Sequence, residues 1–555
     1  MSTARMSDVA DAEDAAATQV VQDTNFALAT SDHTSTPSDG NYDSASTSAS
    51  AAVATKSTTT SSRASRALAP DLLRGLILPL MSLDHAALFL GAWLHGTPKQ
   101  SESAGTVFTR WNFTTAYISR TITHLCAPGF FLLMGMGCVY FHRSRVRIGW
   151  SSGRMTRHFV VRAVALTLVS EVMGETLMWG RHILVINIVL IGLAVDYLLT
   201  GLLCLGVDRT EAALAKWLDQ WLRTEPKHGN RAETRPLLST GGGEEPCSIT
   251  PSTQSHSTSF WLHNALLLLL SYISIFWNVW LSPTGGRCAS TSLEPSWLPH
   301  HQVPIELLAL VDTSTDQPRV APSSHLGPWF DFWFYPVQNS YVMSGFPPLA
   351  WLSFCVFGML YARVMLHKRW TPKAVAAWNL SVAVVLAALF VGTRLLHFGN
   401  LSEDCLRIGG QQVPDGANQY LISVKSFFYI TKYPPSPSFF FLTMSINFAL
   451  LAVFSAMPPS MASFLPGLPN YGGSALFFYV AHMYLYFLLA VPVRYLFEHD
   501  LPDKPPNEWE QTKGLGNTPP FWITWILGLL ILSPMCRAYG AFKAKQPEDS
   551  IWRFF

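Results

Sequence analysis

Charged residues are scarce in this sequence. Asp, Glu, Lys and Arg together make up 13% of its 555 residues, about half of the share that is usual in a soluble domain. Hydrophobic residues make up 49% and aromatic residues 13%, and several apolar runs reach the roughly 20 residues that a helix needs to cross a bilayer. This composition excludes an ordinary soluble enzyme and predicts an all-α, polytopic membrane protein in a lipid bilayer.

Signals of several other protein classes are missing. The eight cysteines form no Cys-x-x-Cys pair and no zinc-ligand spacing, so we expect no metal site. The net charge of +2 is not concentrated in a basic arm, and no RNA-binding motif is present, so we expect no nucleic-acid partner. The polar N-terminal segment lacks the apolar core of a signal peptide, so we expect the first membrane span to direct insertion.

Three parts of the chain follow from its composition. Residues 1–66 are rich in Ser, Thr, Ala and Asp, with "STSASAAVATKSTTTSSR" as the clearest stretch. They have too few apolar residues to form a core and are predicted to be a disordered cytosolic tail. Residues 67–545 are predicted to form a membrane domain, and residues 546–555 a short C-terminal tail. The Ser-rich tail favours a eukaryotic source, with a fungus as the first candidate.

About ten helices of this membrane domain are predicted to cross the bilayer. Their ranges are near 72–94, 117–141, 158–178, 183–206, 259–281, 347–366, 374–396, 438–458, 473–495 and 519–540. The two longest connections, 208–258 and 282–346, lack regular hydrophobic periodicity and are predicted to be loops.

The basic residues give the orientation of these spans. Lys and Arg cluster after the second, fourth and sixth spans, for example in residues 143–157 and 363–373, and they are sparser in the alternate connections. Basic connections normally stay in the cytosol. The bias therefore predicts that both termini and the 208–258 loop are cytosolic and that the 282–346 loop is non-cytosolic.

Four residues on the predicted non-cytosolic side are candidates for modification. Asn112 in "NFT" and Asn400 in "NLS" stand in glycosylation acceptor sequences. Cys288 and Cys405 are the cysteines of these connections, where a disulfide can persist. Two free thiols are an equal alternative to that disulfide.

Ionisable residues inside the spans are the first candidates for function. Asp84 and His85, in "SLDH", lie about ten residues inside the first span and therefore near the bilayer middle. His482, in "FFYVAHMYLYF", lies at a similar depth in the ninth span, and His124 lies nearer the outer surface in the second. Such a residue costs roughly 2.5–3.5 kcal/mol to insert and usually faces a cavity or a partner.

A structural role is the main alternative for each of these residues taken alone. A single histidine among aromatic residues, such as His482, is ordinarily a hydrogen-bonded core residue. Asp84 and His85 are harder to explain in this way, because neighbours on a helix point about 100° apart and each needs its own partner. Together with His482 and His124, they predict a polar cavity around the first span that is suited to proton transfer.

Basic and aromatic residues mark the ends of several spans. Arg74 opens the first span, Arg120 opens the second, Arg394 closes the seventh, and Lys432 with Tyr433 precedes the eighth. Anchoring at the membrane interface is the ordinary role of such residues. The alternative is a set of cations that binds an anionic ligand.

Five segments, in chain order, resemble one known family. They are "LLRGLILPLMSLDHAALFLGAW", "RTITHLCAPGFFLLMGMG", "SFFYITKYPPSPSFFFLTM", "ALFFYVAHMYLYFLLA" and "PMCRAYGAFKAK". They resemble the heparan-alpha-glucosaminide N-acetyltransferase catalytic-domain family, and most closely its prokaryotic-type branch of transmembrane acyltransferases. The resemblance runs from about Asp71 to Lys545 and covers all ten predicted spans.

The resemblance implies an integral-membrane acyltransferase that moves acetyl from the co-substrate acetyl-CoA to a hydroxyl or amine of a small-molecule or glycan acceptor. His85 would be the general base or a transient acyl carrier, and Asp84 would orient a histidine or hold a proton. His482 and His124 would line the same cavity, and His124 competes with His85 for the reactive role.

The span ends gain roles from the same resemblance. Arg74 would contact the donor on the cytosolic side, whereas Arg120, Arg394, Lys432 and Tyr433 would contact the acceptor on the other side. A vacuolar, other endomembrane or plasma-membrane location is expected. The rival functions are an inactive membrane scaffold and a proton-coupled secondary transporter, which the lack of a convincing repeat between the two halves weakens.

Overall fold

The computed structural model describes most of the predicted membrane domain. The described residues are 68–93, 96–97, 100–101, 114–177, 185–224, 252–282, 285–286, 328–338, 341–401, 417–462, 465, 467–501, 513–547, 550 and 552. They belong to two compact units, of which Leu68–Arg537 is the larger. The predicted N-terminal tail lies outside the described residues, as do Asn112, Cys288 and Cys405.

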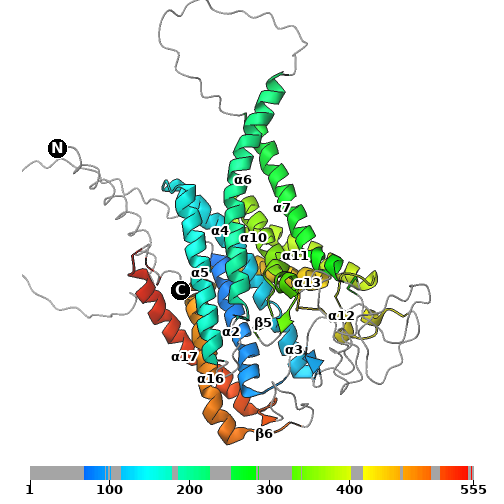
Figure 1. Ribbon diagram of the computed structural model, residues 1–555, viewed down its shortest axis with the longest axis vertical. Coiled ribbons are helices and arrows are strands. Elements are labelled where there is room, and N and C mark those ends of the chain that lie inside the picture. The colour runs from blue at the N-terminus through cyan, green and yellow to red at the C-terminus, as the bar shows by residue number, and fades with distance from the viewer. Residues whose placement is uncertain are drawn as a thin grey trace, which may run out of the picture. The chain divides into compact units, whose positions relative to one another are not determined.

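The described part of the chain is an all-α, polytopic helix bundle, as predicted (Figure 1). Its helices of 20 or more residues are α2 (Leu68–Leu90), α4 (Cys126–Arg147), α5 (Ser152–Leu177), α6 (Leu190–Thr224), α7 (Thr253–Leu281), α10 (Pro348–His367), α11 (Pro372–Leu395), α13 (Pro437–Ala456), α16 (Ala475–Phe497) and α17 (Pro519–Ala544). Each of them overlaps one predicted span, and the chain is a multi-pass membrane protein.

One predicted span differs from the others in composition. Nine helical segments of the described residues are long and apolar enough to cross a membrane, and α5 is not among them. It carries Arg162, Glu171 and Glu175, and Glu171 accepts a hydrogen bond from the backbone N–H of Ile186 at 3.3 Å. α5 runs beside α6 (Figure 1), so a membrane crossing by this helix stays a prediction.

The predicted second span is divided into two helices. Two residues, His124 and Leu125, separate the end of α3 (Thr114–Thr123) from the start of α4 at Cys126. Pro128 explains the break, because it has no backbone N–H to donate to the carbonyl oxygen of His124 and its ring crowds that turn. α3 packs against α2.

Both connections predicted to be loops contain regular structure, which corrects that prediction. α6 continues to Thr224 and α7 begins at Thr253, so both helices extend into 208–258. Asp219 of α6 accepts a hydrogen bond from the backbone N–H of Ser252 at 2.9 Å, beside the start of α7. The prediction was wrong because α6 becomes amphipathic after its apolar part, so a search for apolar runs ends before the helix does.

The remaining elements of the described chain are short. The helical ones are α9 (Pro328–Phe334), η1 (Gln419–Leu421), α12 (Val424–Phe427), α14 (Pro459–Ala462) and α15 (Gly467–Gly473). The strands are β1 (Gly96–Thr97), β2 (Gln100–Ser101), β3 (Val185–Asn187), β4 (Val337–Gln338), β5 (Val342–Ser344), β6 (His499–Asp500) and β7 (Lys513–Gly514). α9, β4 and β5 lie within residues 282–346, so the prediction that this whole connection is a loop was also wrong.

The strands form three small sheets at helix ends. β1 pairs antiparallel with β2, and β6 pairs antiparallel with β7. β5 lies between β3, to which it is parallel with Val185 opposite Val342, and β4, to which it is antiparallel. The Asn187 side chain joins this sheet to the start of α10, because its Nδ2 donates to the carbonyl oxygen of Phe346 at 2.7 Å.

The helix ends support the predicted alternation of direction. Arg143 near the end of α4 donates to the carbonyl oxygen of Leu366 near the end of α10 at 2.8 Å. Arg363 of α10 forms an ion pair with Glu211 of α6. The C-terminal parts of α4, α6 and α10 therefore lie together, as expected if the second, fourth and sixth spans all run toward one side.

α2 lies among several partners, which matters for its polar centre. It packs against α3, α4, α13, α15 and α16. The adjoining core is aromatic, with the ring of Trp351 stacked on Phe131 at 5.2 Å and in edge contact with Phe439 at 5.9 Å. Polar residues in the second half of α2 are therefore enclosed by other helices.

The α4–α10 contact gives a first testable prediction. A Cβ atom on Gly135 would overlap the carbonyl oxygen of Cys355, whereas a Cβ on Gly137 of the same helix meets nothing within 4 Å. We expect Gly135→Ala to lower the free energy of unfolding by about 1–3 kcal/mol. The matched Gly137→Ala should be neutral or stabilising, because alanine favours the helix. Titration with SDS in mixed micelles measures both, and equal stability of the two variants would contradict the close packing.

Candidate functional site

His85 of α2 and His482 of α16 form a direct pair. The Nδ1 atom of His85 lies 2.7 Å from Nε2 of His482. Their rings are 17° from parallel, with centroids 5.0 Å apart. His482 is fully buried and His85 is half-buried. Two histidines that lie almost 400 positions apart in the sequence thus meet where α2 and α16 pack together.

The hydrogen bonds of this pair assign the protons on both rings. Nδ1 of His482 lies 2.9 Å from the carbonyl oxygen of Phe478, and a carbonyl oxygen can only accept, so this Nδ1 carries the hydrogen. In neutral His482 the Nε2 atom is then an acceptor, and His85 donates to it through Nδ1. The Nε2 atom of His85 is left with its lone pair and has no hydrogen-bond partner among the described residues.

Asp84 forms a buried ion pair with Arg120. The Nη1 atom of Arg120 donates to both carboxylate oxygens of Asp84, at 3.0 and 2.8 Å. Both side chains are almost completely buried. Arg120 is therefore engaged with a carboxylate, and the role of Asp84 in orienting a histidine or holding a proton stays a prediction. The physical reason is that each buried charge needs an opposite charge beside it.

Lys432 is a buried cation of a different kind. It is 5% exposed, and it makes no ion pair or hydrogen bond with the residues that the structure describes. Its Nζ lies 5.0 Å from the ring centroid of Tyr433 and 5.8 Å from that of Phe346. The two predicted acceptor residues Lys432 and Tyr433 thus contact each other, and their role in binding an acceptor stays a prediction.

Two other predicted site residues are not brought to this pair. The ring of His124 packs edge-on against Phe439 of α13 at 5.6 Å, and no contact joins it to His85 or His482. Arg74 forms an ion pair with Asp71 at 3.0 Å. It lies eleven residues before His85 in α2, which is about 16 Å of helix rise. Direct contact thus joins two of the three histidines, and a cavity shared by all three stays a prediction.

Arg394 belongs to a separate polar cluster beyond the end of α11. Its Nη1 donates to the carbonyl oxygen of Tyr429 at 2.9 Å, and its guanidinium lies 4.1 Å from the ring centroid of Tyr420. Asn400 is 1% exposed, donates to the Tyr420 hydroxyl at 3.2 Å and accepts from the Thr431 hydroxyl at 2.7 Å. A glycan on Nδ2 would break these contacts, so the predicted glycosylation of Asn400 is not supported.

The sequence reasoning missed Tyr479. Its hydroxyl is buried and has no hydrogen-bond partner among the described residues. Its ring centroid lies 5.7 Å from that of His482 and 6.3 Å from that of His85. Its spacing from His482 could have indicated it, because residues three apart on a helix share one face. The site therefore has a phenol beside the histidine pair.

Comparisons with known proteins assign no family to this sequence. No family model matches the sequence, and no curated protein matches it. Among the described residues, no group of three or more His, Cys, Asp or Glu side chains is placed to hold a metal ion.

Proposed function

We propose that the protein is an integral-membrane acyltransferase that moves an acetyl group from acetyl-CoA to a hydroxyl or amine of a sugar-like acceptor. The observation that carries this proposal is the histidine pair, in which His482 accepts from Nδ1 of His85 at 2.7 Å. This contact holds His85 in the tautomer that directs a basic nitrogen, Nε2, away from its partner. The family resemblance of the sequence supplies the reaction class.

His85 can serve the reaction in two ways. As a general base, its Nε2 takes the proton of the acceptor O–H or N–H while the acceptor attacks the thioester carbonyl. The C–S bond then breaks, CoA leaves as its thiolate, and His85 returns the proton to that sulfur. As a carrier, Nε2 attacks that carbonyl first, the C–S bond breaks and CoA leaves as its thiolate, which then takes a proton. The acceptor next attacks the acetyl-imidazole, loses its proton and frees Nε2. In both cases His482 keeps its hydrogen bond to Nδ1.

The neighbouring polar groups suit the charge that develops. Attack on a thioester places negative charge on the carbonyl oxygen, and a buried cation or hydroxyl near that oxygen stabilises it strongly in a water-poor site. The Tyr479 hydroxyl has no hydrogen-bond partner in the described chain, and its ring centroid lies 6.3 Å from that of His85. Lys432 is a buried cation whose charge acts on His85. We assign the oxyanion or an anionic part of the acceptor to Lys432.

A proton-coupled transporter fits these contacts less well. A relay has to pass the proton onward from each member to another titratable group. The His85–His482 chain ends at the carbonyl oxygen of Phe478, which does not take up a proton at physiological pH. This favours a histidine pair that orients one reactive nitrogen. A cytosolic donor, approaching past Arg74, and a vacuolar, other endomembrane or plasma-membrane location belong to the proposal.

Release of CoA tests this function. Purified full-length protein in lipid nanodiscs should consume acetyl-CoA and release free thiol when glucosamine or another amino sugar is added, and mass spectrometry should show the acetylated sugar. Without acceptor, a burst of CoA equal to the amount of protein would identify His85 as carrier, and no burst would identify it as base. Acetyl-CoA that stays intact with every amine and alcohol tested, together with proton-driven sugar uptake into vesicles, would contradict the proposal.

A further inference from the structure

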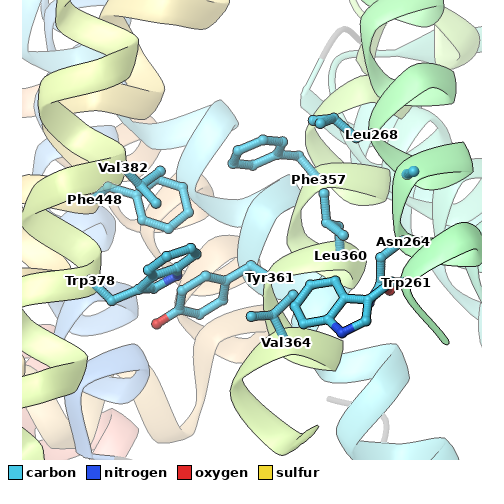
Figure 2. Close-up of a pocket in the computed structure, with 11 residues that line it drawn as sticks. Trp261, Asn264, Leu268, Phe357, Leu360, Tyr361, Val364, Trp378, Val382 and Phe448 are labelled. Carbon is cyan, nitrogen blue, oxygen red and sulfur yellow. The ribbon is translucent and has the colours of Figure 1, made fainter. Parts of the chain in front are cut away.

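A second site lies on the side of the bundle, at an apolar groove between α7, α10, α11 and α13. Figure 2 shows Trp261 and Leu268 of α7 on one side, Trp378 and Val382 on the other, and residues of α10 between them. Trp261, Leu268 and Trp378 are 52%, 52% and 39% exposed, so the groove opens outward where a membrane protein meets lipid. Its volume of about 280 Å³ lies at the small end of ligand pockets and suits one hydrocarbon chain.

One polar group of this groove lacks a partner. Asn264 lines the groove and is 3% exposed. Its Oδ1 accepts from Nε of Arg363 at 2.9 Å, which fixes the orientation of the amide, and its Nδ2 has no hydrogen-bond partner among the described residues. A buried N–H without an acceptor costs free energy. An otherwise apolar ligand with one acceptor oxygen at this depth would satisfy it.

Positive charge lies next to the groove. Lys368 and Arg369 are exposed on the connection from α10 to α11, and Lys373 is exposed in the first turn of α11. The Nζ of Lys368 lies 4.2 Å from the ring centroid of Trp370, whose ring centroid lies 5.9 Å from that of Trp378 in the groove. By the charge bias of the sequence, this connection faces the cytosol, and the cytosolic leaflet carries the anionic lipids.

We propose that this groove binds one acyl chain of an anionic glycerophospholipid of the cytosolic leaflet. The chain fills the apolar groove, an ester carbonyl accepts from Nδ2 of Asn264, and the headgroup contacts Lys368, Arg369 and Lys373. The distance along α10 between these two contacts fits a phospholipid. Arg363, the partner of Asn264, lies five residues before Lys368, or about 7 Å along the helix axis. Ester and phosphate groups of such a lipid are similarly close. This inference does not depend on the acyltransferase proposal.

Lipid retention by the purified full-length protein tests the inference. The protein is equilibrated in mixed micelles with equal amounts of phosphatidylserine and phosphatidylcholine that have identical acyl chains. It is then separated by size exclusion, and its bound lipid is measured by mass spectrometry. We expect about a hundredfold more phosphatidylserine than phosphatidylcholine, since each of the three basic side chains near an anionic headgroup favours it by roughly 1 kcal/mol.

Five variants separate the parts of the proposal. Ala265→Trp fills the groove and should lower phosphatidylserine retention about tenfold, whereas Leu269→Trp, on the same helix outside the groove, should not. Val382→Trp fills it from the opposite wall, in case Ala265→Trp does not fold. Asn264→Asp keeps an acceptor for Arg363 but removes the donor, so it should lower retention of both lipids. Replacement of Lys368, Arg369 and Lys373 by Gln should remove the preference for phosphatidylserine and leave total lipid unchanged.

The same measurement can overturn the inference. Equal retention of the two lipids by the unaltered protein would contradict the headgroup contact. A preference for phosphatidylserine that persists in the triple Gln variant would contradict it as well. Equal retention by Ala265→Trp and Leu269→Trp would remove the groove as the binding place. Displacement of both phospholipids by an added sterol would assign the groove to a different ligand class.

Discussion

Replacement of His85 by alanine is expected to abolish acyl transfer while leaving the fold intact. The Nε2 atom of His85 is the basic nitrogen that the contact with His482 leaves without a partner, and a positioned base accelerates proton transfer about 10²- to 10⁴-fold. We expect kcat to fall by at least this factor, and by more if His85 carries the acyl group. The measurement is CoA release from acetyl-CoA at saturating acceptor.

His263 provides the matched control for this variant. It is another buried histidine of the bundle, bonded to the carbonyl oxygen of Ser259 and to the hydroxyl of Thr210, far along the chain from the histidine pair. His263→Ala should cost stability but not turnover per folded molecule. Normal turnover in a folded His85→Ala variant would remove His85 from the reaction.

His482 has a positioning role that a second variant isolates. His482→Leu removes the acceptor for Nδ1 of His85, so the imidazole of His85 can rotate and its proton can move to Nε2. His482→Gln offers a side-chain oxygen in place of the imidazole nitrogen and should restore part of kcat. A purely structural role for His482 predicts similar kcat per folded molecule for both variants, with the difference confined to stability.

The two histidines of the pair could be selected from the sequence because a polar side chain costs free energy to insert into a membrane. A polar residue in the membrane needs a reason, and helix rise places His85 and His482 at similar depth in two spans. Depth alone did not show that the rings touch, because the neighbour relation of α2 and α16 comes from packing across the whole domain. His124 met the same criterion of polarity, but its ring lies against Phe439. Depth does not specify the direction of a side chain.

The partner of Asp84 was not predictable from the spans. A continuous helix over 117–141 places Arg120 at a membrane surface, where anchoring or ligand binding is the natural interpretation. The structure divides this segment at His124 and Leu125, and Arg120 of α3 lies inside the bundle, 2.8 Å from a carboxylate oxygen of Asp84. Pro128 was the signal for the break, but a proline near a helix start is compatible with either geometry.

Replacement of Arg120 by methionine is expected to be strongly destabilising. The ion pair of Arg120 and Asp84 has side-chain exposures of 5% and 9%, and removal of one partner of a buried pair leaves the other charge without compensation. Such a loss costs about 3–5 kcal/mol. Titration with SDS in mixed micelles measures the change, and Arg74→Met, which removes the more exposed pair with Asp71, should cost less than about 1 kcal/mol.

The double variant Asp84→Leu with Arg120→Met separates stability from function at this pair. When both charges are replaced by apolar side chains of similar size, no buried charge remains, so most of the lost stability should return. If the pair only holds α2 and α3 together, the double variant also regains turnover. If its field tunes His85, on which both charges act, turnover stays low and the pH at half-maximal kcat shifts. A double variant as unstable as Arg120→Met would show that uncompensated charge is not the cause of the destabilisation.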